Sequence, residues 1–246
     1  MRHALGLNGP TPAAVLDTQL ESAQRLARSA RTIVDTLNAQ PMYQSPEIRA
    51  VYARVRQLAH LATDAADHLI DAVDILDDTR AGIPVELGDD FLAVLTEQQA
   101  RQEAGRRFTL VASLTALGAS DALATAELFV AERHRRGFAP EDQPPALSPA
   151  QTTALRAVAH GDVAITSGKP YLRREDIRVS ISTIRALESR GLVMREDCPD
   201  WFRDERLHLT ASGRRGLAAS FARPRPTGLT TRPAPPVPTA AASRSR

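Results

Sequence analysis

Cysteine is almost absent from the chain, since Cys198 is the only one among 246 residues. An internal disulfide is therefore excluded, and with it the class of small secreted proteins that disulfides hold together. Uninterrupted apolar runs are short, and the first residues lack the apolar stretch of a secretory signal. We therefore expect a soluble, cytoplasmic protein with no membrane-spanning segment and no membrane partner.

Aromatic residues are also scarce, at 4% of the chain, whereas hydrophobic residues as a whole reach 43%. The core must therefore consist mainly of Leu, Val, Ile and Ala, a composition typical of packed helices. The sequence lacks a glycine-rich phosphate loop, a nucleophile elbow and a paired metal signature. We therefore expect neither an enzyme nor a protein with a bound cofactor.

Acidic residues are fewer than basic ones in the second half of the chain. Residues 141–246 carry 17 basic and 11 acidic side chains, whereas residues 1–140 carry 14 and 18. Because phosphate contacts supply most non-specific affinity for nucleic acid, a polyanion is expected to bind the basic half. Residues 1–12 and the proline- and arginine-rich residues 222–246 are predicted to be disordered.

Residues 13–137 carry apolar side chains at every third or fourth position, the period of packed α-helices. The pattern predicts helices over 13–38 and 46–79, a third that begins near Asp89–Asp90, and a fourth from Asp121 to Arg136. A helix as long as the second cannot bury its own apolar stripe without partner helices. We therefore predict a long-helix bundle or coiled coil that holds two chains together as a homodimer.

One face of the helix predicted for 46–79 is acidic, and it lies opposite the apolar stripe. His60 and His68 flank this face, and with Asp64 between them they have helical metal-ligand spacing. Charge runs on long helices are usually solvated, which is the interpretation adopted for this one, with no metal. An alternative is that the acids dock the basic part of the same or another chain. The acidic positions are Asp64, Asp67, Asp71, Asp74 and Asp78.

A proline-rich linker is predicted at 138–147, and residues 148–221 then mix helix signals with short strands. A serine cap followed by proline begins a helix that stops at Gly161. β-Branched residues and turn residues over 162–172 predict two short strands. Ser180 caps another helix, which leads into two strands joined by a loop of about eleven residues. Thr210 caps a final helix.

Two motifs in this region resemble those of bacterial winged helix-turn-helix regulators. The segment V-S-I-S-T-I-R-A-L-E-S-R-G-L-V at 179–193 is similar to their recognition helix and first wing strand. The segment D-E-R-L-H-L-T-A-S-G at 204–213 resembles the wing exit of the MarR group. The resemblance covers residues 148–221 and implies a mainly α protein that ends in a winged helix-turn-helix domain of α+β type.

The resemblance also implies which residues bind double-stranded DNA. In such families the recognition helix enters the major groove, and the wing touches the backbone or the minor groove. Neighbouring arginines extend the expected basic face. The predicted DNA-binding residues are Arg173, Arg174, Arg178, Ser180, Ser182, Thr183, Arg185, Ser189, Arg203 and Arg206.

Two features depart from the family pattern. Residues 171–178 replace the regular helix expected before the recognition helix, and they suggest one turn or a hairpin arm. The wing is acidic, and acids there repel phosphate. Two hypotheses therefore remain: a homodimeric transcriptional regulator that binds DNA, and a helical scaffold or adaptor whose winged helix contacts a protein partner. The wing acids are Glu196, Asp197, Asp200, Asp204 and Glu205.

Overall fold

The computed structural model describes residues 13–40, 42–87, 91–138, 144–197 and 205–222, and it is mainly helical with a small antiparallel sheet. This confirms the mainly α class that the sequence predicts. The predicted disordered segments 1–12 and 222–246 lie outside the described residues, except for Ala222. The N-terminal part, the helical body, consists of α1 (Ala13–Ala39), α2 (Pro46–Ala81), β1 (Val85–Glu86), β2 (Leu92–Ala93), α3 (Glu97–Thr115) and α4 (Gly118–Arg135).

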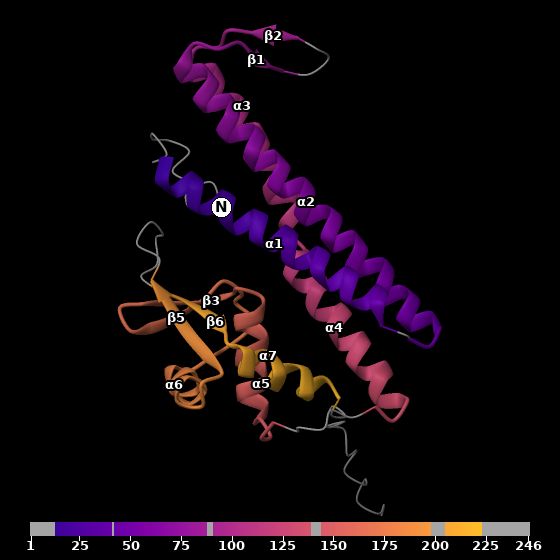
Figure 1. The fold of residues 1–246 in the computed structure, drawn as a ribbon. Coiled ribbons are helices and arrows are strands. Elements are labelled where there is room, and N and C mark those ends of the chain that lie inside the picture. The colour runs from indigo at the N-terminus through magenta and orange to yellow at the C-terminus, as the bar shows by residue number, and fades with distance from the viewer. Residues whose placement is uncertain (1–12, 41, 88–90, 139–143, 198–204, 223–246) are drawn as a thin grey trace, which may run out of the picture.

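The 36-residue α2 is the centre of the helical body, and α1, α3 and α4 all pack against it (Figure 1). Ser45 is buried and caps α2 by accepting a hydrogen bond from the Ile48 backbone N–H at 3.1 Å. The buried side of α2 is rich in alanine, so the helices approach closely. Ala62 and Ala66 pack on Ala27 of α1.

The prediction that a helix begins near Asp89–Asp90 is wrong. These two residues lie outside the described ones, and β1 and β2 on either side of them form an antiparallel hairpin. The helix α3 begins only at Glu97, because Thr96 and Gln99 form a reciprocal capping box. Two acids suit the dipole at a helix N-terminus, but a side-chain cap with both hydrogen bonds is the stronger signal.

The helices α3 and α4 follow one another with only two residues between them. Together, over Glu97–Arg135, they are long and apolar enough to cross a membrane by length and composition alone. This corrects the expectation that no segment has those properties. Only 11% of the most apolar window in this stretch is buried within the chain. Much of the apolar surface of α3 and α4 is therefore uncovered.

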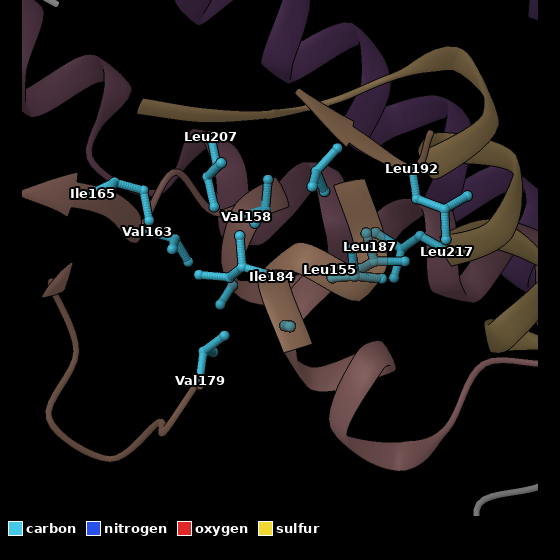
Figure 2. Close-up of a cluster of buried hydrophobic side chains, with 13 residues drawn as sticks. Leu155, Val158, Val163, Ile165, Val179, Ile184, Leu187, Leu192, Leu207 and Leu217 are labelled. Carbon is cyan, nitrogen blue, oxygen red and sulfur yellow. The ribbon is translucent and has the colours of Figure 1, made fainter. Parts of the chain in front are cut away.

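The C-terminal part, the α/β module, surrounds a core of its own (Figure 2). Leu155, Ile184 and Leu187 are fully buried at its centre. The four strands form an antiparallel sheet in the order β4-β3-β6-β5. The elements are α5 (Pro149–Ala159), β3 (Val163–Thr166), β4 (Lys169–Leu172), α6 (Ile181–Ser189), β5 (Val193–Asp197), β6 (Glu205–Leu209) and α7 (Ala211–Phe221).

The helix-turn-helix pair implied by the resemblance is not formed, because residues 162–180 contain no helix before α6. They contain a hairpin of β3 and β4 instead. Ser167 and Gly168 have φ values of 49° and 72°, the left-handed conformation of a tight two-residue hairpin turn. The turn directs the chain back along β3, and the residues after β4 reach α6 in an extended and bent conformation.

The α/β module contacts the helical body through α4. Arg156 of α5 forms an ion pair with Glu127 of α4, with 2.7 Å between Nη2 and Oε1. Leu123 of α4 packs against the core of the α/β module. Further contacts join α4 to α7. In the view of Figure 1, α5 and α7 lie between α4 and α6.

Candidate nucleic-acid interface

The helix α6 has one buried face and one exposed polar face. Ser180 has an extended conformation and caps the helix by accepting a hydrogen bond from the Thr183 N–H at 3.1 Å. Ile184 and Leu187 are 0% exposed, which fixes the rotation of α6 on the core. Most of the predicted DNA-binding residues of α6 therefore lie on the opposite side. Ser182, Arg185 and Ser189 are exposed, and Thr183 is half-buried.

Ser180 has a structural role as well as an exposed position. Its Oγ lies 2.8 Å from Ser182 Oγ and 2.9 Å from Thr183 Oγ1, in addition to accepting the capping hydrogen bond. The three hydroxyls therefore form a cluster at the N-terminus of α6. Donors at a helix N-terminus favour an anion, so the cluster suits a phosphate oxygen better than a base edge.

Arg185 is the central cation of the exposed α6 face. Its side chain is exposed and makes no ion pair with any described residue. The exposed Arg178, just before the Ser180 cap, likewise has no carboxylate partner in the described part of the chain. Arg173 is exposed after β4, and its backbone N–H donates to the Asp162 carbonyl at 2.9 Å. These three guanidinium groups remain available to an anion.

Arg174 differs from these three because Asp176 neutralises it. Its Nε and Nη2 donate to the two oxygens of Asp176 at 3.0 and 2.6 Å. The same hydrogen bonds raise the pKa of Arg174 and lower the pKa of Asp176. Both groups stay charged, so the pair contributes little net attraction for phosphate. Arg174 therefore carries less weight in the predicted interface than its neighbours.

Arg195 of β5 is a residue that the sequence did not single out. Its Nε lies 2.5 Å from Glu188 Oε1 of α6, and its Nη1 lies 2.8 Å from Glu205 Oε2 of β6. The hydrogen bond to Glu188 is the main cause that raises the pKa of Arg195. Arg195 thus joins α6 to both strands of the β5–β6 hairpin. Glu188 is seven residues away in another element, so no local spacing signals the pair.

Arg206, predicted as the wing arginine, is half-buried in β6. Its guanidinium lies next to Gly161, in the turn between α5 and β3, so close that an added Cβ there would be 2.8 Å from Nη2. Arg206 therefore lies at the C-terminal end of α5 and does not belong to the group of cations around Arg185. Arg203, the other predicted wing arginine, lies outside the described residues.

The wing is less repulsive to phosphate than its sequence suggests. Of its acidic residues, Asp200 and Asp204 lie outside the described part. Glu205 is paired with Arg195, and Glu196 lies against His208 of the neighbouring strand. Asp197 is the one described wing acid that is exposed with no ion pair among the described residues.

The acidic face of α2 shows no metal-binding geometry. Among the described residues, no group of three or more His, Cys, Asp or Glu side chains is placed to hold a metal ion. His68 and Arg107 both approach Asp71, with 3.7 Å from His68 Nδ1 and 3.8 Å from Arg107 Nη1 to Oδ2. The face therefore takes part in contacts between α2 and α3. Of its other acids, Asp67 and Asp74 are exposed, and Asp64 and Asp78 are half-buried.

Comparisons with known proteins find no matching family model, no similar curated protein and no similar solved structure.

Proposed function

We propose that the chain is a double-stranded DNA-binding protein, of the bacterial transcriptional-regulator type, whose residues 148–221 act as a winged helix. The observation that carries the proposal is the exposed polar face of α6, with Arg185 at its centre, which forms no ion pair with any described residue. An α-helix with its side chains is about 10–12 Å across, which suits insertion into a major groove about 12 Å wide. In this proposal the exposed Arg178 and Arg173, which precede α6 in the chain, contact the backbone phosphates beside that groove.

The way α6 is held supports this role. Two fully buried side chains, Ile184 and Leu187, anchor it from behind, and Arg195 ties it to the β5–β6 hairpin. Sequence-specific readout needs side chains on a rigid element, because a mobile one loses affinity to ordering entropy. The β5–β6 hairpin follows α6 directly through Gly191, whose φ of 64° closes the helix. In this proposal it is the wing.

Because residues 162–180 contain no helix, other residues would have to contact the phosphate backbone of the DNA. In helix-turn-helix proteins the first helix crosses the phosphate backbone. Here β4 and residues 173–180 occupy that position in the chain order, and they carry Arg173, Arg174 and Arg178. We propose that this arginine-bearing arm takes over the backbone contacts. Over residues 169–190 there are six basic and three acidic side chains, which agrees with such a role.

An adaptor function is the second candidate, and one observation favours it. Asp197 is exposed on the wing without an ion pair among the described residues, and a free carboxylate there would face phosphate. The other described wing acids weigh less, because Arg195 and His208 lie against them. The DNA-binding proposal therefore accounts for more of the surface.

The proposal is tested by selecting duplexes from a random pool with the full chain and titrating a selected duplex by fluorescence anisotropy. We expect binding at low salt, with affinity falling about tenfold or more between about 50 and 200 mM salt, as neutralised phosphates release counterions. A protein that retains no duplex even at the lower salt concentration, while remaining folded, would favour the adaptor instead.

The Arg195→Met variant tests whether neutralising the two carboxylates matters for binding. It leaves Glu188 and Glu205 uncompensated near the DNA, so we expect affinity to fall about three- to tenfold. Because the side chains are partly exposed, the stability cost should stay near 1 kcal/mol or below. The measurement is the anisotropy titration at one fixed salt concentration, with urea unfolding alongside.

The matched control is the double variant Arg195→Met/Glu188→Gln. If repulsion is the cause, removing one of the two freed charges restores part of the lost affinity. Binding by Arg195→Met at the wild-type level, or no recovery in the double variant, would show that Arg195 acts only as a structural tie between α6 and the hairpin.

A further inference from the structure

A pocket lies where the helical body meets the α/β module, between α4, α7 and the end of α6. It encloses about 620 Å³, within the range of roughly 300–1,000 Å³ that small-molecule sites occupy. Three arginines line it, namely Arg133 of α4, Arg190 at the end of α6 and Arg215 of α7. None of its described lining residues is acidic. This junction pocket therefore presents three positive charges with no described carboxylate among them.

Neutral groups hold two of these arginines in place. Arg190 donates from Nη1 to Gln151 Oε1 at 3.0 Å, and Arg215 donates from Nη2 to Ser212 Oγ at 3.4 Å. Neither acceptor is charged, and neither arginine forms an ion pair with a described residue. The hydrogen bonds therefore position the two guanidinium groups and leave their charge uncompensated.

Arg133 has the weakest partners of the three. It is half-buried, and its guanidinium carbon lies 5.8 Å from the ring centre of Phe129 and 4.7 Å from that of Phe138. Among the described residues, its hydrogen-bond acceptor is the sulfur of Met42, 3.8 Å from Nη1. Ring faces and a thioether attract a guanidinium group less strongly than an anionic oxygen does. Arg133 therefore favours an anion in the pocket.

The acids on the surrounding helices are engaged elsewhere. Glu132 of α4 is fully buried and pairs with Arg135 and Arg136, and Glu188 of α6 pairs with Arg195. The acid of α4 that faces the α/β module is already paired with α5. The helix α7 contains no acidic residue. No described carboxylate on these helices is therefore left to neutralise the pocket.

Most of the remaining wall of the pocket is apolar. Apolar walls gain free energy by covering carbon, so they fit an organic anion better than a bare inorganic one. They also distinguish the pocket from the exposed face of α6, which is polar. The apolar residues of the wall include Phe129, Val130, Phe138, Leu192, Ala218 and Ala219.

The positive charge of the lining favours a phosphate over a carboxylate. A phosphate monoester carries about 1.5 to 2 negative charges near pH 7 and offers three acceptor oxygens, so several guanidinium groups can share it. A carboxylate has a single charge on two oxygens and would leave more of the positive charge uncompensated. Guanidinium groups also bind phosphate through paired hydrogen bonds.

We propose that the junction pocket binds a small phosphate monoester with an apolar body. The phosphate lies among Arg133, Arg190 and Arg215, and the apolar body lies against α4 and α7. Such a ligand contacts both the helical body and the α/β module and so links them. The inference does not depend on DNA binding, because none of the predicted DNA-binding residues is among the described residues that line the pocket.

The test is isothermal titration calorimetry of the full chain with 1-naphthyl phosphate, without DNA. We expect one site per chain. The affinity should exceed that for inorganic phosphate, which lacks the apolar body, and for 1-naphthol, which lacks the charge, by about tenfold or more in each case. 1-Naphthoate has the same body with a carboxylate and should bind more weakly than the phosphate.

Two variants test the arginines themselves. Arg133→Met keeps an unbranched apolar side chain between the two rings, and Arg215→Met changes an exposed position, so both should keep the wild-type far-UV circular dichroism. Each should lower the affinity for 1-naphthyl phosphate about tenfold or more, because charge-assisted hydrogen bonds to the phosphate are lost.

The matched control is Arg214→Met. Arg214 is exposed on α7 next to Arg215 but does not line the pocket, so its loss should change the affinity by less than about twofold. A wild-type chain that takes up no 1-naphthyl phosphate would overturn the proposal, as would one that floats with phosphatidate vesicles instead. Equal affinity for 1-naphthoate, wild-type affinity in both pocket variants, or an equal loss in Arg214→Met would also overturn it.

Discussion

Replacing Arg185 with alanine is expected to weaken binding to a selected duplex about ten- to a hundredfold, the range for loss of one base-contacting arginine. The reason is that Arg185 is the exposed cation at the centre of the α6 face and has no described carboxylate to satisfy it. The loss should depend on sequence, because a bidentate contact to a base edge discriminates among base pairs. Anisotropy titrations against the selected duplex and against single-base variants of it measure both effects.

Arg54→Ala is the matched control for this prediction. Arg54 is exposed on α2 in the helical body and makes no ion pair with a described residue, so the same chemistry is removed far from α6. It should bind DNA like the wild-type chain at equal salt. Equal affinity of Arg185→Ala and wild type would refute the placement of α6 in the groove, even if the chain binds DNA by another surface.

Gly213→Ala is expected to destabilise the α/β module by about 3 kcal/mol or more, because the added atom overlaps main chain. A Cβ at this position would lie 1.9 Å from the carbonyl oxygen of Leu192. The contact is close because Thr210, the cap of α7, donates its backbone N–H to the same carbonyl at 3.1 Å. The first turn of α7 is thus held against the start of β5, and the two segments cannot move apart without breaking this hydrogen bond.

Gly216→Ala is the control on the same helix. Its added Cβ would be 3.9 Å from the nearest side-chain atoms, an ordinary contact. Replacing a glycine inside a helix with alanine usually gains about 0.5–1 kcal/mol, so this variant should be slightly more stable than wild type. Urea unfolding followed by far-UV circular dichroism compares the two variants. Similar midpoints for both would mean that α7 does not pack as closely on Leu192 as the structure has it.

The starts and ends of helices in the α/β module could be predicted well because they depend on neighbouring residues. Ser148 with Gln151, Ser180 and Thr210 each form the cap that their sequence indicates. Gly161 and Gly191 have positive φ values at the ends of α5 and α6, where only glycine is unstrained. A cap or a helix end involves residues at most four positions apart, so its signal is local.

The two strands before α6 could also be predicted, because β-branched and turn residues over 162–172 indicate a short hairpin, and β3 and β4 form there. Local patterns do not contain the place of this hairpin in the sheet, because β3 also pairs with β6, which is distant in the chain. The candidate site shares this limit. The exposed α6 face follows from its own periodicity, whereas the contact of Arg195 with Glu188 and the position of Arg206 beside Gly161 depend on residues that folding brings together.

By itself, the amino-acid sequence determined where most helices begin and end and which side of α6 faces the core, since periodicity and caps act within a few residues. Tertiary structure alone decided that Arg195 ties α6 to the β5–β6 hairpin and that arginines of α4, of α7 and of the end of α6 line one pocket. The physical reason is the same in both cases. These features join side chains from separate elements, so they depend on packing distances that no local pattern contains.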